Sequence, residues 1–292
     1  MEVTAFAAAK VNLYLHLIGR RADGYHLLDS LVAFPAIGDR ITARKAASLS
    51  LTVGGPEAPS LAGLGEDNLV LRAARLLADH AGIPDGASLH LEKNLPVAAG
   101  LGGGSSDAAA ALRALCALWD VPIDEEALGR LGARLGADVP ACLHSGAAWV
   151  GGVGEYVMPA PSLPPVGIVL ANPRIPLPTA AVFAARRGPF GNSARMTSVP
   201  GDAAAFAQAL KRRRNDLTEA AIGCVPEIAA VLATLARLPG TLIARMSGSG
   251  ATCFALFADR VMAEEARAAL AAAQPGWWSA AGSFLAGKRL SR

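Results

Sequence analysis

The chain has few aromatic residues and no dominant charge. Phenylalanine, tyrosine and tryptophan make up 5% of its 292 residues, and 27 basic and 24 acidic residues give a formal net charge of only +3. No long basic run is present, and the densest basic cluster, residues 212–214, has no aromatic residue interleaved with it. Such a cluster is more typical of a solvated helix face than of an RNA site. The composition therefore gives no reason to expect nucleic acid as a partner.

Metal-binding cysteine motifs, a secretory signal and a membrane span are also missing. The four cysteines are too far apart in the sequence for a zinc site, and we expect them to be reduced and buried. The first residues lack a basic segment followed by an apolar core, so we expect no secretory signal. The longest uncharged stretch, residues 156–173, contains five prolines and cannot form a membrane-spanning helix. These absences favour a cytoplasmic enzyme without a membrane partner.

The length and the proline distribution suggest two domains. A chain of 292 residues is long enough for two, by the rule of roughly 150 residues each. Prolines cluster between residues 159 and 165 and form the best candidate linker. We therefore place the domain boundary near residue 160, which gives domains at 1–160 and 161–292. The mixture of strands and helices expected in the second half indicates an α+β architecture.

Hydrophobic periodicity, turn residues and capping residues predict the individual elements. The expected strands cover residues 10–17, 31–34, 40–43, 49–53, 88–93, 166–171 and 252–257, and residues 149–154 are expected to form a strand or a turn. The expected helices run from Asp67 or Asn68 to about residue 80, from Ser105 or Ser106 to 119, from Asp124 to 135, from about 137 onward, and over 178–186, 203–214, 226–238 and 262–273.

The strand at residues 10–17 has an unusually regular alternation. Apolar side chains at every second position define one face, while Lys10, Asn12, Tyr14 and His16 define the other. This pattern predicts a half-buried strand that presents Lys10 and Asn12 on the same polar face.

Residues 93–107 contain the most informative stretch of the chain. Four glycines fall within residues 100–104, two serines follow, and an apolar, alanine-rich segment extends from there to Trp119. Glycines let a ligand approach the backbone closely, and Ser105 and Ser106 are good N-cap residues. A helix N-terminus has unpaired N–H groups and the positive end of the helix dipole. The stretch therefore predicts a loop that binds the phosphates of a nucleotide.

Two common nucleotide-binding motifs do not fit this loop. It lacks the Gly-Lys-Ser/Thr ending of a P-loop, and no acidic residue closes a dinucleotide-binding unit around it. Phosphoryl transfer needs positioning, charge neutralisation and a group that orients or deprotonates the acceptor hydroxyl. Lys10 and Asp138 are candidates for the last two tasks. The alternative interpretations are a solvated strand residue for Lys10 and a simple N-cap for Asp138.

Several separated motifs, in the same order, resemble those of the GHMP small-molecule kinases. They are Ala-Lys-Val-Asn-Leu at 9–13, Pro-Val-Ala-Ala-Gly-Leu-Gly-Gly-Gly-Ser-Ser at 96–106, Gly-Ala-Asp-Val-Pro at 136–140 and Ser-Gly-Ser-Gly-Ala at 247–251. Ala98 and Ala99 depart from the pattern, since glycine is frequent there in the superfamily. The resemblance implies an N-terminal α/β domain with a glycine-rich phosphate loop and a C-terminal ferredoxin-like α+β domain.

A further motif, Arg-Ala-Asp-Gly-Tyr-His at 21–26, is similar to that of the superfamily members that act on a cytidine diphosphate derivative. The resemblance implies that ATP, with Mg²⁺, phosphorylates the 2-hydroxyl of the erythritol moiety of that small molecule, in the non-mevalonate route to isoprenoid precursors. Asp138 would be the catalytic base. Lys10 would lower the pKa of the hydroxyl and balance the charge of the transferring group.

The resemblance also implies the binding residues. Those for the acceptor substrate are Asn12, Tyr25, His26, Thr179 and Phe183, of which Tyr25, His26 and Phe183 would recognise the cytosine. Those for ATP are Pro96, Gly100, Gly102, Gly103, Gly104, Ser105, Ser106, Gly248, Ser249 and Gly250. Lys93 and Asn94 would be contacts at the rim only, and the motifs imply no protein ligand for the metal.

Two other functions stay open at this point. The chain could be another GHMP kinase, acting on homoserine, mevalonate or a sugar. It could also be a non-catalytic nucleotide sensor on the same scaffold, although the presence of Asp138 argues against this. We expect a monomer or a weak homodimer, and residues 186–202 match no motif.

Overall fold

The computed structural model describes residues 1–61, 65–83 and 86–286. Contacts divide the chain into two compact units. The first contains residues 1–9, 38–97 and 102–144, and the second contains residues 10–37, 98–101 and the chain from residue 145 onward. The units therefore interleave along the sequence, and the predicted boundary near residue 160 lies inside the second unit. The physical reason is strand pairing, because residues 26–33 pair with residues 148–152 across more than a hundred positions.

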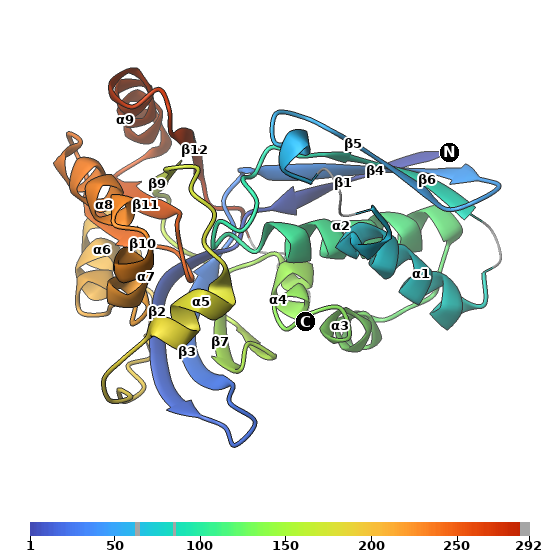
Figure 1. The fold of residues 1–292 in the computed structure, drawn as a ribbon, viewed down its shortest axis with the longest axis horizontal. Helices are drawn as coiled ribbons and strands as arrows, with labels where there is room; N and C mark the ends of the chain where they lie inside the picture. The colour runs from blue at the N-terminus through green and yellow to red at the C-terminus, as the bar shows by residue number, and fades with distance from the viewer. Residues whose placement is uncertain (62–64, 84–85, 287–292) are drawn as a thin grey trace. The chain divides into compact units, whose positions relative to one another are not determined.

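The first unit is a four-stranded sheet with helices packed against it (Figure 1). The strand order is β1-β4-β6-β5, antiparallel except for the parallel pair β5 and β6. The strands are β1 (Glu2–Ala8), β4 (Gly38–Ala46), β5 (Ser50–Gly54) and β6 (Gly86–Glu92). The helices are α1 (Leu69–Ala81), α2 (Gly103–Trp119), α3 (Glu125–Ala133) and α4 (Val139–His144), with short 3₁₀ turns at Ala58–Leu61 and Gly65–Asp67. Helix α2 packs against β1 and β4, and it also contacts α1 and α4.

Two helix starts in this unit confirm the predicted caps. The side chain of Asn68 accepts a hydrogen bond from the backbone N–H of Val70 at 2.9 Å, and that of Asp124 accepts one from Ala127 at 2.7 Å. Helix α1 ends at Gly82, whose φ of 64° is the left-handed conformation common after a helix. Local capping chemistry thus determines these boundaries.

The start of α2 differs from the prediction. The N-cap is Gly102, with a φ of 61°, and no side chain caps the helix. Ser105 and Ser106 therefore lie inside the first turn rather than at the cap. Gly102 adopts a left-handed conformation that a residue with a Cβ atom rarely adopts. The helix therefore begins directly after this glycine, before the serines that could have capped it.

Within its described residues, the second unit contains two antiparallel sheets and five helices (Figure 1). The first sheet has the order β2-β3-β7-β8, and its strands are β2 (Val11–Arg20), β3 (His26–Ala33), β7 (Ala148–Gly152) and β8 (Tyr156–Pro159). The second has the order β10-β11-β9-β12, and its strands are β9 (Gly167–Asn172), β10 (Ile243–Met246), β11 (Cys253–Phe257) and β12 (Trp278–Ser283). The helices are α5 (Thr179–Ala185), α6 (Ala203–Lys211), α7 (Thr218–Cys224), α8 (Glu227–Arg237) and α9 (Arg260–Ala273).

The second of these sheets has the expected ferredoxin-like topology. Along the chain, β9 is followed by helices, then by β10 and β11, then by α9 and β12, which is the β-α-β-β-α-β arrangement. Helix α8 packs against β10 and β11, while α9 packs against β9 and β12. Their apolar faces form one core with the sheet, including Ile228, Val231, Phe257 and Leu270. The predicted two-domain α+β class is confirmed.

Strand β2 confirms the prediction of a strand but not of a half-buried one. Its supposed polar face is covered as well, with Asn12, Tyr14 and His16 all buried. Met196 donates its backbone N–H to the Tyr14 hydroxyl at 3.3 Å, and Arg214 donates its own to His16 Nε2 at 3.2 Å. Segments distant in sequence therefore cover this face, which the local pattern does not reveal.

Other expectations need smaller corrections. Strands β1, β8, β10 and β12 and helix α7 were not predicted. The four cysteines are free, as expected, but Cys224 is exposed and Cys116 only half-buried. In the part of the chain that the structure describes, none of the helices combines the length and the apolar character of a membrane span.

Candidate active site

The glycine-rich loop is divided between the two units, with residues 98–101 in the second and residues from 102 onward in the first. In the first unit, the initial backbone bond of α2 runs from Ser106 N–H to the Gly102 carbonyl at 2.8 Å. The N–H groups of Gly103, Gly104 and Ser105 precede it, and these are the donors that a helix leaves without an intrahelical acceptor. Gly104 is exposed, and its two neighbours are half-buried. This helix start can therefore donate to an anion.

Ser106 has a different environment from the residues before it. It is buried, and its hydroxyl donates to the Cys142 sulfur of α4 at 3.2 Å. Asp138 immediately precedes α4, is half-buried, and accepts a hydrogen bond at its carbonyl from Cys142 N–H at 3.1 Å. The amide and the hydroxyl of Ser106 are thus both used within the fold. Its contacts link the start of α2 to the helix that begins after Asp138.

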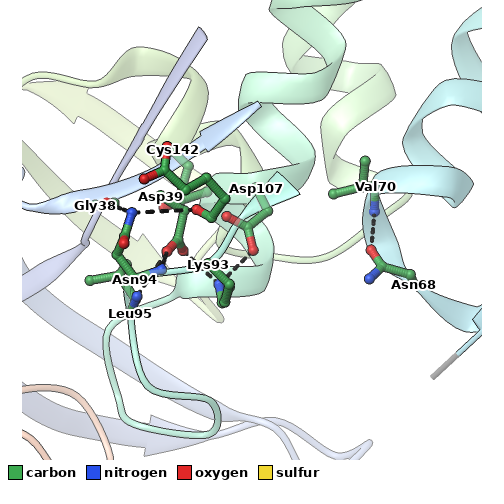
Figure 2. Close-up of polar contacts among 11 residues, drawn as sticks. Gly38, Asp39, Asn68, Val70, Lys93, Asn94, Leu95, Asp107 and Cys142 are labelled. Atoms are coloured by element: carbon green, nitrogen blue, oxygen red, sulfur yellow. Dashed lines mark hydrogen bonds and ion pairs between the residues drawn. The ribbon is translucent and has the colours of Figure 1, made fainter. Parts of the chain in front are cut away.

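A buried cluster of charges adjoins the loop, and we refer to Asp39, Lys93 and Asp107 as the charge triad (Figure 2). The Lys93 ammonium lies 2.6 Å from Asp39 Oδ2 and 2.6 Å from Asp107 Oδ2. The side chains of Lys93, Asp39 and Asp107 are 3%, 0% and 4% exposed. Asp39 comes from β4, Lys93 directly follows β6, and Asp107 lies in α2. Lys93 is therefore a buried bridging residue rather than the expected rim contact.

The second oxygen of Asp39 binds the backbone that leads into the loop. Its Oδ1 accepts hydrogen bonds from the N–H groups of Asn94 at 2.6 Å and Leu95 at 2.8 Å. Both oxygens of Asp39 are thus used. The Oδ1 atom of Asp107, by contrast, is buried and has no hydrogen-bond partner among the described residues.

Burial and neighbouring charges alter the titration of the triad. Burial raises the pKa of Asp107 to about 7, an effect that the Lys93 ammonium opposes and the Asp39 carboxylate reinforces. Burial alone would lower the pKa of Lys93, but the two carboxylates outweigh it and raise that pKa above its usual value. Lys93 is therefore a cation at neutral pH, whereas Asp107 titrates close to neutrality.

In the second unit, residues 98–101 contact the glycine turn at 246–251. The Ser247 hydroxyl donates to the Gly100 carbonyl at 3.0 Å, and the Thr252 N–H donates to the Ala99 carbonyl at 3.1 Å. A Cβ atom on Gly100 would lie 2.6 Å from the Ser247 carbonyl oxygen, so only glycine fits this approach. The two motifs, far apart in sequence, are therefore neighbours.

Lys10 and Asn12 contact the same region of the second unit. Lys10 is buried, and its N–H donates to the Leu101 carbonyl at 2.8 Å. The N–H of Asn12 donates to the Ser247 hydroxyl at 3.1 Å, and its side-chain amide donates to the Ser30 hydroxyl at 2.8 Å. Ser247 thus connects β2 to residue 100. Its motif was noted in the sequence, but this connecting role was not predicted.

Thr179 and Phe183 share one face of α5, because they are four residues apart. The Thr179 hydroxyl lies 2.9 Å from that of Ser249, and the Phe183 ring lies 5.0 Å from the His26 ring, tilted by 37°. A base stacked between the two rings would need their centroids roughly 7 Å apart, twice the ~3.5 Å contact distance. The rings therefore contact each other directly in this structure.

Of the other aromatic residues considered around His26, Phe190 contacts its ring and Tyr25 does not. Tyr25 is 65% exposed and has no ring contact among the described residues, so the structure does not bring it together with His26 and Phe183. Phe190 belongs to the stretch without a matching motif, and its ring centroid lies 5.8 Å from that of His26. The Arg186 guanidinium lies over the Phe190 ring, 4.7 Å from its centroid. Burial, and then Arg20 and Arg186, lower the pKa of His26. The imidazole is therefore neutral at physiological pH.

The described residues contain no group of three or more histidine, cysteine, aspartate or glutamate side chains able to hold a metal ion.

Comparison with known proteins agrees with this arrangement. The model of the GHMP kinases N terminal domain matches residues 68–146, and that of the GHMP kinases C terminal matches residues 193–276. A 4-diphosphocytidyl-2-C-methyl-D-erythritol kinase of Paramagnetospirillum magneticum is 52% identical over 279 residues, covering 96% of this chain and 97% of the relative. The chain belongs to this family of GHMP kinases. The relative of the same name from Parvibaculum lavamentivorans is 53% identical over 286 residues, covering 96% and 98%.

Solved structures of GHMP kinases support the same assignment. The crystal structure of a 4-(cytidine 5'-diphospho)-2C-methyl-D-erythritol kinase matches with a TM-score of 0.79 and 38% identity, covering 98% of this chain and all of that one. A homoserine kinase from Cytophaga hutchinsonii matches with a TM-score of 0.72 at 17% identity, covering 98% and 95%. The second likeness concerns the fold alone.

Proposed function

We propose that this GHMP kinase transfers the γ-phosphoryl group of ATP to the 2-hydroxyl of 4-diphosphocytidyl-2-C-methyl-D-erythritol. The observation that carries the proposal is the identity of 52% with a relative of that name over 96% of the chain. In the reaction the acceptor oxygen forms a bond to the γ-phosphorus, the bond from that phosphorus to the bridging oxygen breaks, and ADP leaves. The product is a phosphate monoester in the route to isoprenoid precursors.

The donor side of the reaction is assigned to the loop and to α2. Gly103, Gly104 and Ser105 offer backbone N–H groups for the ATP phosphates. The resemblance to the GHMP kinases also assigns Pro96, Gly100, Gly102 and the turn at 248–250 to ATP binding. Ser106 contributes indirectly, because its hydroxyl and its amide are both bonded within the fold. A Mg²⁺ ion bound together with ATP would neutralise charge on the phosphates.

The acceptor side is assigned to residues of the second unit. Asn12 and Thr179 hold the acceptor, and the contacting rings of His26 and Phe183 offer a stacking surface for the cytosine. Tyr25, which is 65% exposed, covers the bound base. A neutral His26 can both donate and accept a hydrogen bond at the base edge.

Chemistry is assigned to Asp138 and Lys10. Asp138 accepts the proton of the acceptor hydroxyl, and Lys10 favours the developing alkoxide and balances charge on the transferring group. We place the enzyme in the cytoplasm, acting on a small molecule without nucleic acid, as a monomer or a weak homodimer. We also keep the boundary between its two family domains near residue 160, which is supported by the position of that residue between the two matched regions, although the contact-based units interleave along the sequence.

A substrate panel tests the proposal. The purified protein is incubated with Mg-ATP and, separately, with 4-diphosphocytidyl-2-C-methyl-D-erythritol, homoserine, mevalonate or galactose, and ADP is measured by a coupled assay. We expect ADP above the no-acceptor background with the first compound only. Turnover of homoserine, mevalonate or galactose, or no turnover of any acceptor, would refute the proposal.

A further inference from the structure

The charge triad joins the two ends of the glycine-rich loop within the first unit. Asp39 binds the N–H groups of Asn94 and Leu95, where the chain leaves β6 and enters the loop. Asp107 lies in α2, which begins directly after the loop. The Lys93 ammonium contacts both carboxylates at 2.6 Å (Figure 2). One buried cation therefore connects the backbone before the loop to the helix after it.

The first turn of α2 packs directly against this cation. A Cβ atom added to Gly103 would lie 3.2 Å from the Lys93 nitrogen, which is closer than most real Cβ contacts. Gly103 also supplies one of the free N–H groups of the helix start. The position of the ammonium is thus coupled to the donors that face the phosphates.

We propose that Asp39, Lys93 and Asp107 are positioning residues that hold the α2 N-terminus in the geometry that binds ATP. This inference rests on the proposed function, which assigns the ATP phosphates to that helix start. The triad does not attract phosphate by its charge, because it combines two carboxylates with one ammonium. Its contribution is geometric, through short bonds to a charged ammonium, which fix direction more strictly than apolar packing.

Stability alone does not account for the triad. Burying charges costs desolvation, and apolar residues of similar volume often stabilise a protein as well or better. Asp107 moreover keeps one buried oxygen without a partner among the described residues. A cluster that is costly to bury and incompletely satisfied, yet joins both ends of a functional loop, is best explained by the geometry it imposes.

The test compares the triad with an exposed ion pair on the same strands. Arg40 and Glu92 are the β4 and β6 neighbours of Asp39 and Lys93, lie 3.7 Å apart, and are 54% and 47% exposed. Lys93→Met and Asp107→Asn are compared with Arg40→Ala and the wild type. The KM values for Mg-ATP and for the acceptor are measured separately, and Mg-ADP binding is measured by calorimetry without acceptor.

We expect Lys93→Met to weaken Mg-ADP binding and raise the KM for Mg-ATP at least tenfold, and Asp107→Asn to do so about threefold. The acceptor KM should stay within twofold of the wild type, and Arg40→Ala should change neither KM. Unchanged KM values in both triad variants, or equal increases for both substrates, would overturn the inference. If Lys93→Met does not fold, Asp107→Asn alone decides.

The two proposals fail in different ways. A wild-type protein that binds Mg-ADP but does not phosphorylate the acceptor would refute the proposed function and leave the calorimetric comparison of the variants intact. A wild-type protein that binds no Mg-ADP would overturn both.

Discussion

The charge triad of the first unit and the ring pair of the second unit are built from opposite kinds of contact. In the triad, three charged side chains at most 4% exposed make ion pairs of 2.6 Å. In the ring pair, the half-buried His26 and Phe183 make a tilted contact at 5.0 Å, and Tyr25, which precedes His26 in the sequence, is 65% exposed. The part assigned to ATP is thus fixed by buried charge, whereas the part assigned to the cytosine is formed by accessible aromatic surface.

This difference suggests where specificity resides. Homoserine, mevalonate and galactose kinases share the fold at 11–17% identity, so the fold alone does not select the acceptor. All kinases of this kind need a place for ATP, but each needs its own acceptor contacts. Accessible rings can be exchanged at low cost in stability, since surface substitutions are usually mild. Buried charge pairs cannot be exchanged at low cost, because removing one partner leaves the other buried and unpaired.

The largest effect should come from a residue that belongs to neither set. Asp138→Asn removes the proposed base while keeping the size of the side chain, so kcat should fall roughly 10²–10⁴-fold, the usual contribution of general acid–base catalysis. Both KM values should change little. Asp124→Asn is the matched control, because Asp124 caps α3 and asparagine caps equally well. Equal kcat values in the two variants would reduce Asp138 to a helix cap.

The next effect should separate the ring pair from the triad. His26→Ala removes a ring and a hydrogen-bonding group, and we expect the acceptor KM to rise about tenfold, which corresponds to about 1.4 kcal/mol. The KM for ATP should not change. Tyr156→Ala, at a 70% exposed aromatic residue of the same sheet, is the control. The comparison would break down if His26→Ala raised the KM for ATP as much as that for the acceptor.

A third effect concerns the pH dependence of stability. The folded protein keeps a proton on Asp107 up to about pH 7, whereas the unfolded chain loses it near the ordinary value of 3.8. The folded state therefore binds this proton more tightly than the unfolded chain does. The stabilisation from the bound proton is fully present below about pH 3.8 and is lost as the pH rises from there to about 7.

Urea denaturation at pH 5 and pH 8 measures this effect. The wild type should lose more stability between the two values than Asp107→Asn, which has no proton to lose. Parallel losses in the two proteins would show that Asp107 is not the titrating group.

The smallest expected effect is a difference in the free energy of unfolding between glycine variants at two adjacent alanines of the loop. Ala98 has a φ of 53°, a left-handed conformation that costs an alanine roughly 1 kcal/mol. Ala98→Gly should therefore raise the free energy of unfolding by up to about 1 kcal/mol, measured by denaturant titration. Ala99→Gly, at a residue whose φ is not positive, should instead lower the free energy of unfolding. The same sign in both variants would mean that backbone strain at Ala98 is not relieved.

The sequence predicted those parts of the fold that depend on neighbouring residues. The caps of α1 and α3 follow from Asn68 and Asp124, and the course of α2 follows from its apolar spacing. The start of α2 was misplaced because the left-handed conformation of Gly102, not a serine side chain, begins the helix. The grouping of residues 98–101 with residues 246–251 came only from the resemblance to known kinases.

The buried charges were not predicted, and the reason is physical. Asp39, Lys93 and Asp107 are far apart in the sequence, and a charged residue is normally exposed. Only the pairing of β4 with β6 and the packing of α2 against β4 bring the three together. The covered face of β2 was missed for the same reason, because residues 196 and 214 bind Tyr14 and His16 from distant segments.

The most direct test of the central claim follows the phosphorus atoms rather than ADP, since ADP also forms when ATP is merely hydrolysed. In a ³¹P NMR time course with Mg-ATP and 4-diphosphocytidyl-2-C-methyl-D-erythritol, the γ-phosphate signal should decline while one new phosphate monoester signal grows, coupled to no other phosphorus. The diphosphate signals of the acceptor should persist. A rise of inorganic phosphate without the monoester signal would contradict the account.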